Sequence, residues 1–174
     1  HALLPQDALP NCGLESDAKF GGLFKELRHL IETREEPEVV TEWLEKQKLD
    51  DDTIPDEVWR APLLLQVIFL IAGDVPSAFT NLIERYIDPL RTLSASEHGE
   101  LALVSNVSDC LNHDQGYLNK VLDILLRRSV LTVTAAAKWA TQDEQLNTLA
   151  TDVWSYKHIE LICDRSIDIA RAAV

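Results

Sequence analysis

The chain has 174 residues, enough for one domain with a sizeable core, and its 46% hydrophobic content excludes disorder over most of its length. Its 29 acidic and 16 basic side chains give a formal net charge of −13. Such a charge disfavours direct binding to nucleic-acid phosphates and favours basic protein partners. The longest apolar run, residues 63–72, is too short to span a bilayer, so we expect no membrane association.

The N-terminal region predicts a lead-in followed by a first helical hairpin. Residues 1–18 are punctuated by Pro and Gly and are expected to be irregular. Apolar residues then recur at helical spacing over residues 20–31, and Pro37 suits the first turn of a second helix. We expect residues 19–174 to form one helical domain. Because the chain begins with His1, lacks methionine and ends within a helical pattern, we expect it to be a fragment of a larger protein.

An acidic run, DDDTIPDE, follows the second helix. Its simplest interpretation is a solvated connection, and the alternative is a binding site for basic partners. The candidate partner-binding residues are therefore Asp50, Asp51 and Asp52, together with Trp59, which follows the run closely. The other tryptophans lie on apolar faces and are expected in the core: Trp43, Trp139 and Trp154.

Two helices are predicted in the middle of the chain. Pro62 is expected to open an apolar core helix that ends before Gly73. The next helix, over residues 79–93, is strongly amphipathic. Pro89 lies inside it and lacks the N–H that would bond to Arg85, which predicts a kink.

The C-terminal half predicts further hairpins. Ser94 with Glu97 resembles a capping box, and Asp114 is the expected N-cap of an amphipathic helix. A tight turn at residues 129–132 leads to a short helix that ends near Trp139, and a last helix begins near residue 152.

The predicted helices fall into pairs that begin near residues 19, 62, 96 and 133. Repeat spacings of roughly 34 to 43 residues are typical of HEAT-type helical hairpins. The fold class is therefore predicted to be all-α, with about eight helices in stacked antiparallel hairpins that form an α-solenoid.

Cysteine usage indicates no metal site. Cys12, Cys110 and Cys163 lack metal-ligand spacing, and we expect all three to be reduced, as in the cytosol or nucleus.

Catalytic signals are equally sparse, because the sequence contains no phosphate loop and no nucleophile elbow. His98 beside Glu97 and His113 beside Asp114 are explained better by helix starts than by catalysis. We therefore predict no catalytic, cofactor-binding or metal-binding residue. The remote alternative is a helical enzyme whose pocket is lined by His98, Glu97 or His113.

Four segments occur in an order that is typical of one family. They are LLLQVIFLIAG, SAFTNLIERYIDPLRTLSASEHGEL, NKVLDILLRRSVLTVTAAAKWA and DVWSYKHIELIC, preceded by the acidic run. The span from about Leu63 to Asp164 thereby resembles the third HEAT-like domain of the large subunit of the nuclear cap-binding complex. That domain is related to the middle domain of translation initiation factor 4G. Pro89 departs from the family pattern.

The resemblance implies a non-enzymatic scaffold without a cofactor. In that family the large subunit holds a small RNA-recognition-motif subunit, which binds the 7-methylguanosine cap, and presents surfaces to RNA-processing, export and decay factors. Capped RNA would then be contacted only indirectly. The location would be nuclear, with shuttling to the cytoplasm. The alternative is a HEAT-like domain of another mRNA scaffold, in translation initiation or nonsense-mediated decay.

Overall fold

The computed structural model describes residues 13–142 and 153–173. These residues form nine α-helices and one short 3-10 helix, without a strand. In chain order they are η2 (Leu14–Ser16), α1 (Gly21–Glu32), α2 (Pro37–Lys46), α3 (Asp56–Ala72), α4 (Pro76–Arg85), α5 (Ile87–Leu93), α6 (Glu97–Cys110), α7 (Gln115–Arg127), α8 (Val133–Ala140) and α10 (Val153–Ala172).

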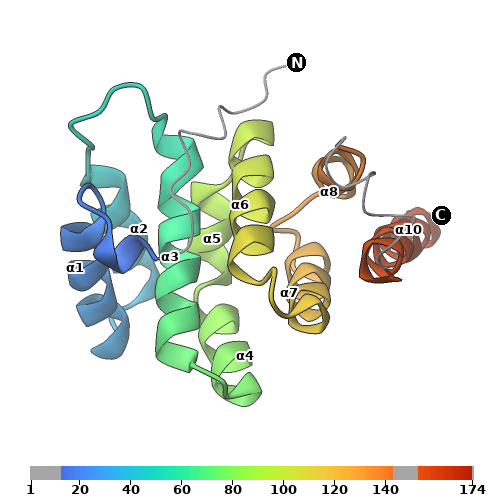
Figure 1. The fold of residues 1–174 in the computed structure, drawn as a ribbon, viewed down its shortest axis with the longest axis horizontal. Helices are drawn as coiled ribbons and strands as arrows, with labels where there is room; N and C mark the ends of the chain where they lie inside the picture. The colour runs from blue at the N-terminus through green and yellow to red at the C-terminus, as the bar shows by residue number, and fades with distance from the viewer. Residues whose placement is uncertain (1–12, 143–152, 174) are drawn as a thin grey trace.

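The helices stack in two layers along the long axis of the molecule (Figure 1). In one layer α1 contacts α3, α3 contacts α6, and α6 contacts α8. In the other layer α2 contacts α5, and α7 contacts α10. Each pair of consecutive helices crosses from the first layer to the second, so the predicted stack of antiparallel hairpins is confirmed.

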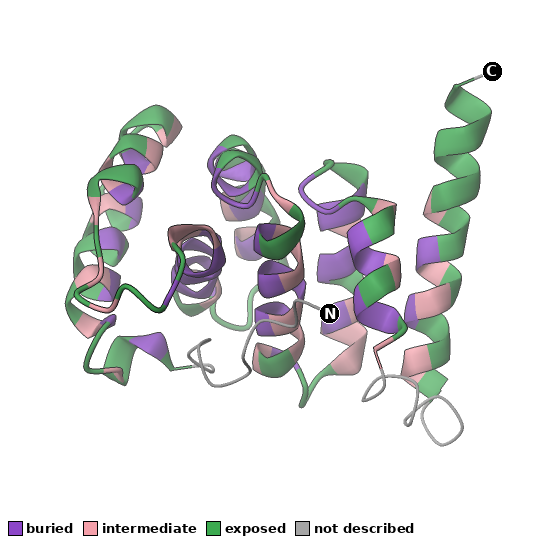
Figure 2. Ribbon diagram, turned by 90° about the horizontal axis from the view of Figure 1, so that it is seen from above, coloured by how far each residue is buried: buried purple, intermediate pink, exposed green. Residues whose placement is uncertain are grey.

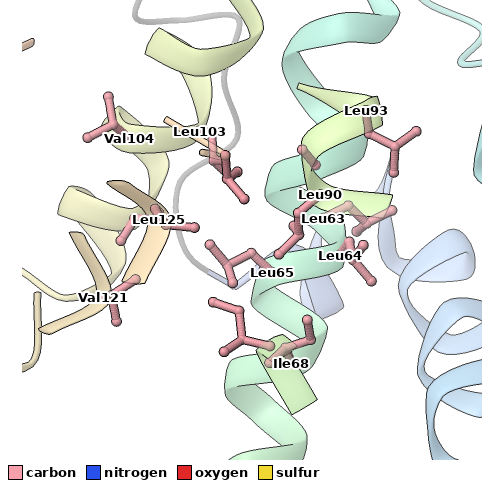
Figure 3. Close-up of a cluster of buried hydrophobic side chains, with 14 of the residues drawn as sticks. Leu63, Leu64, Leu65, Ile68, Leu90, Leu93, Leu103, Val104, Val121 and Leu125 are labelled. Atoms are coloured by element: carbon pink, nitrogen blue, oxygen red, sulfur yellow. The ribbon is translucent and has the colours of Figure 1, made fainter. Parts of the chain in front are cut away.

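Helix α3 is the centre of this stack. Every residue from 58 to 68 except Arg60 is buried, because the helix is apolar around most of its circumference and has neighbours on both sides and in the other layer. Figure 3 shows Leu63, Leu64 and Leu65 of α3 packed among side chains from α5, α6 and α7. Burial on this scale is the main source of the stability of the fold.

The start of α3 differs from the prediction. The helix begins at Asp56, not at Pro62, and Pro62 lies buried in its interior. A proline there leaves the Val58 carbonyl without its usual helical N–H partner. The apolar burial on both sides of Pro62 outweighs this loss, so the helix continues through it.

The predicted kink at Pro89 is a break between two helices. Helix α4 ends at Arg85 and α5 begins at Ile87, with Tyr86 between them at φ −106° and ψ 21°. Pro89 therefore lies in the first turn of α5, where a missing N–H costs nothing.

The predicted capping box at Ser94 is wrong, because the helix starts two residues later. Ser96 is the N-cap of α6, and its Oγ accepts a hydrogen bond from the Gly99 N–H at 2.9 Å. Ser94 instead donates its hydroxyl to the Leu90 carbonyl at 2.7 Å. The predicted N-cap at Asp114 is confirmed, since its carboxylate accepts from the Tyr117 N–H at 3.0 Å.

Three arginines bind carbonyl oxygens at helix C-termini, where a cation is favoured by the helix dipole. Arg60 donates to Gln47 beyond α2 at 2.8 Å, and Arg85 donates to Arg34 beyond α1 at 2.9 Å. Arg91 donates across to the Arg128 carbonyl at the end of α7 at 2.6 Å. These bonds join α3, α4 and α5 to neighbouring hairpins.

The cysteines differ from their prediction. Cys110, the last residue of α6, is disulfide-bonded, whereas Cys163 is a free and exposed thiol on α10. The expectation that every cysteine is reduced is therefore wrong for Cys110. Cys12 lies outside the described residues.

The ends of the domain are described only in part. Residues 1–12 of the expected irregular lead-in lie outside the described residues, but Leu14 is buried and its N–H donates to Gln66 at 3.4 Å. The last helix begins at Val153, close to the expected residue 152. The boundary of the domain at residue 19 stays a prediction.

Candidate protein-binding surfaces

The acidic connection between α2 and α3 is held by its own ion pairs. Asp51 accepts from Lys19 at 2.5 Å and from the Thr53 backbone N–H at 3.0 Å. The Lys19 bond, followed by the two Thr53 bonds, holds the pKa of Asp51 well below its usual range. Asp50 and Asp52 are exposed and available to a partner. Binding by these aspartates stays a prediction.

Trp59 lies in the core, not on the surface. Its side chain is 1% exposed, its ring centroid lies 5.9 Å from that of Phe20, and its indole N–H donates to Asp56 at 3.3 Å. Asp56 in turn accepts from Lys48 at 2.6 Å, which lowers the pKa of this carboxyl. Trp59 is therefore not accessible to a partner in this structure.

The acidic residues near the two candidate histidines serve the fold. Glu97 forms an ion pair with Lys138 of α8, and this hydrogen bond lowers the pKa of Glu97. His98 lies on α6 with its Nδ1 3.6 Å from Glu57 of α3. Within residues 13–142 and 153–173, no group of three His, Cys, Asp or Glu side chains is suited to hold a metal ion.

A groove of about 890 Å³ lies where the C-terminal end of α3 meets the junction of α6 and α7. We call it the aromatic groove. Its walls come from five separate parts of the chain: residues 13–15, Phe24 of α1, the C-terminal half of α3 with the start of α4, residues 110–120, and Trp154 of α10. Its volume falls within the ~300–1,000 Å³ that is typical of ligand sites.

Three aromatic rings lie together in and beneath this groove. Phe69 stacks on Phe79 with ring centroids 5.3 Å apart and planes at 10°. The ring of Tyr117 lies 5.4 Å from Phe79 and 6.1 Å from Phe69. Burial, followed by the negative charges of Asp114 and Asp74, raises the pKa of Tyr117 to about 12. Its hydroxyl therefore stays protonated and available as a hydrogen-bond donor at neutral pH.

The charges around the aromatic groove are mostly negative. Glu15, Asp74 and Asp114 line it, against Lys120 as the one lysine or arginine among the described lining residues. Glu15 and Asp74 form no ion pair within the described part of the chain. His113 also lines this groove.

A second groove, of about 660 Å³, lies between α4 and α7 and is more nearly neutral. Its charged side chains pair with one another: Arg128 with Glu84 at 3.0 Å, and Arg127 with Asp123 at 2.7 Å. A partner here would have to displace existing ion pairs, so this groove is the weaker candidate.

Helix α10 is fixed to the stack through His158, which is 3% exposed. Its Nδ1 lies 2.8 Å from Oδ1 of Asn119, and its Nε2 lies 3.0 Å from Oε1 of Gln115. The rings of Trp139 and Trp154 flank it at 6.1 and 6.4 Å. These contacts give His158 a structural role that joins α7, α8 and α10.

The sequence matches the family described as MIF4G like over residues 16–171, which is most of the helical stack. The chain belongs to the MIF4G-like family. Its fold is accordingly that of a helical scaffold domain of mRNA-related proteins, and such domains are generally non-catalytic. No curated protein matches this chain. Every helix in the described ranges is too short or too polar to cross a bilayer.

The aromatic groove was not predicted from the sequence. Tyr117 follows the apolar side of its helix and Phe69 lies in a run of core residues, so each is typical of ordinary packing. The one local signal was Gly73–Asp74, which marks the end of α3 and places a carboxylate there. That these parts of the chain meet depends on the stacking of hairpins, which no local pattern encodes.

Proposed function

We propose that this chain is a scaffold domain of the large subunit of the nuclear mRNA cap-binding complex. In this role it supports the small RNA-recognition-motif subunit, which binds the 7-methylguanosine cap, and it recruits RNA-processing and export factors. The observation that carries the proposal is the MIF4G-like match over residues 16–171, combined with the ordered segments between Leu63 and Asp164.

The physical character of the domain supports a binding role. Stacked hairpins with a continuous core form a rigid support, and their loops and outer faces are free to bind partners. The net charge of −13 favours partners with basic surfaces and disfavours direct contact with RNA phosphates. We therefore propose that the domain acts without catalysis and contacts capped RNA only through the small subunit.

The decisive experiment is affinity purification of the tagged full-length parent protein from nuclear extract, followed by mass spectrometry. The proposal expects a small RNA-recognition-motif protein in a stoichiometric amount, with the pair retained on 7-methyl-GTP resin. Recovery of an RNA helicase in place of that small protein would overturn it. That result would favour a scaffold of translation initiation or nonsense-mediated decay.

The same resin tests the indirect contact with the cap. The pure 174-residue chain, without a partner, is expected to flow through 7-methyl-GTP resin. Retention of the pure chain that is reversed by free 7-methyl-GTP would contradict the proposal that the cap is bound only by the small subunit.

The cellular compartment is tested through Cys110. Nuclear proteins keep their thiols reduced, so a nuclear location requires that the disulfide at Cys110 be open in cells. Thiol trapping in intact cells, followed by peptide mass spectrometry, measures this directly. Complete protection of Cys110 from alkylation would place the protein in an oxidising compartment and contradict the nuclear location.

A further inference from the structure

The aromatic groove combines an apolar floor with a negative rim. Leu70, beside Phe69 at the C-terminal end of α3, is 39% exposed, although most of the preceding helix is fully buried. An exposed leucine beside partly buried aromatic rings gains free energy when a partner covers it with apolar surface.

The rim is suited to cations. Asp74 follows the end of α3 and Glu15 follows Leu14, so both carboxylates stand beside the apolar floor. Neither carboxylate is neutralised by an ion pair within residues 13–142 and 153–173. A Lys or Arg side chain placed between them would gain two favourable interactions without displacing an existing pair.

The same charges argue against a nucleic acid in this groove. Single-stranded RNA also stacks its bases on aromatic rings, but its phosphates need several Lys or Arg side chains nearby. Here one lysine, Lys120, faces three carboxylates among the described lining residues. Charge complementarity therefore selects a basic protein segment over RNA.

We propose that the aromatic groove binds a short linear segment of a partner protein in which a bulky apolar side chain lies beside Lys or Arg. The apolar side chain covers Leu70 and the rings of Phe69 and Tyr117, and the cation lies between Glu15 and Asp74. The segment enters between the end of α3 and the start of α7, on the layer that contains α3 and α6. This proposal rests on the scaffold function but not on the identity of the complex.

Binding is measured by fluorescence anisotropy with the full 174-residue chain and the fluorescein-labelled peptide KRLFKL. Two control peptides separate the contributions: ESLFEL lacks the cations, and KRSSKS lacks the apolar side chains. The proposal expects saturable binding of KRLFKL alone, weakened by added salt because the rim charges are exposed.

Matched variants locate the site. Asp74→Lys and Glu42→Lys make the same change in net charge, one at the groove rim and one at an exposed position of α2 that does not line the groove. We expect about a tenfold loss of affinity for Asp74→Lys, equivalent to ~1.4 kcal/mol, and none for Glu42→Lys. Equal losses in the two variants would show non-specific attraction by the overall charge and would overturn the proposal.

The apolar floor is tested in the same way with Leu70→Ser and Val75→Ser. Both residues are exposed, at 39% and 54%, but only Leu70 lines the groove. Leu70→Ser is expected to weaken binding of KRLFKL at least threefold, and Val75→Ser to leave it unchanged. A circular dichroism melt of each variant checks that the fold is intact.

Competition distinguishes other occupants of the groove. The peptide HALLPQDALPN, which copies the first eleven residues of this chain, and the RNA U12 are added to the KRLFKL complex. Displacement by either at an affinity equal to that of KRLFKL would overturn the proposal, since the occupant would then be the chain itself or RNA. The peptide assay uses the 174-residue chain without the small subunit. A negative result in this assay therefore contradicts only the groove proposal, and a negative result in the co-purification contradicts only the proposed function.

Discussion

Helices α3 and α10 differ most in how far they are buried by the rest of the stack. Helix α3 has neighbours in both layers and buries every residue from 58 to 68 except Arg60. Helix α10 contacts α7 and α8, and of its described residues only His158 and Ile162 are buried. Figure 2 shows the C-terminal part of α10 as almost wholly exposed. A solenoid thus concentrates its stability in the middle and leaves its last helix dependent on a few contacts.

The largest expected effect lies at the centre. Leu64→Ala removes a fully buried side chain from α3 and leaves a cavity, so we expect the free energy of unfolding to fall by about 2–5 kcal/mol. Urea denaturation followed by circular dichroism measures the change. The matched change on α10, Ile169→Ala at a residue 59% exposed, is expected to stay within ~0.5 kcal/mol. Similar losses at the two positions would contradict the contrast between the helices.

The second largest expected loss of stability comes from a substitution in the close packing at the start of α6. A Cβ on Gly99 would lie 2.9 Å from the Ser94 carbonyl oxygen, and backbone cannot move aside as a side chain can. We expect Gly99→Ala to lower stability by about 1–3 kcal/mol in thermal unfolding. Gly22→Ala on α1 is the control, because a Cβ there meets nothing within 4 Å. Its expected effect is a gain of up to ~1 kcal/mol.

A smaller effect tests how α10 is attached. Arg165 donates to Asp123 of α7 through Nε at 3.0 Å and Nη2 at 2.7 Å, in a half-buried pair. Arg165→Ala is expected to cost about 1 kcal/mol and to speed amide hydrogen exchange in α10 without affecting α3. Arg171→Ala, in the exposed last turn of the same helix, should change neither. Faster exchange throughout the chain would mean that α10 unfolds only together with the core.

The smallest expected effect is the pH dependence of the contribution that Asp51 makes to stability. Because the pKa of Asp51 is lowered in the folded protein, its ion pair stabilises the fold above the unfolded carboxyl pKa of about 3.9. That stabilisation is lost as the pH falls through the lower folded value. Asp51→Asn should therefore reduce stability at pH 7 and reduce it less as the pH falls below about 3.9, whereas the exposed Asp52→Asn should have little effect at any of these pH values. Chemical denaturation at pH 7, pH 4 and pH 2 measures both, and an Asp51 effect as large at pH 2 as at pH 7 would contradict this account.

The fold class was predictable because it depends on periodicity, which survives in a single sequence. The helices near Pro37, Asp114 and residue 133 follow from apolar spacing and capping residues that act within one turn. The difference at Pro62 is tertiary: this proline lies inside a helix because the core surrounds it. The difference at the start of α6 is local, because Ser96 caps the helix while Ser94 bonds to the Leu90 carbonyl.

The candidate site was much less predictable than the fold. The position of Trp59 next to charged residues in the sequence predicts an exposed side chain, but its ring packs against Phe20 in the core. The aromatic groove combines residues such as Glu15, Phe69 and Tyr117, whose proximity exists only after the hairpins stack. Local patterns identify a helix face as apolar but do not tell whether a neighbouring hairpin covers it.

The arginine bonds to helix ends have a mechanical consequence. Arg85 holds the segment after α1, and Arg91 holds the end of α7, so the α4–α5 unit is tied to the hairpins before and after it. Any change in superhelical curvature at the middle of the molecule must stretch these charged bonds together. When force is applied to the two ends, we expect the terminal hairpin to detach first and the central segment to keep its bend.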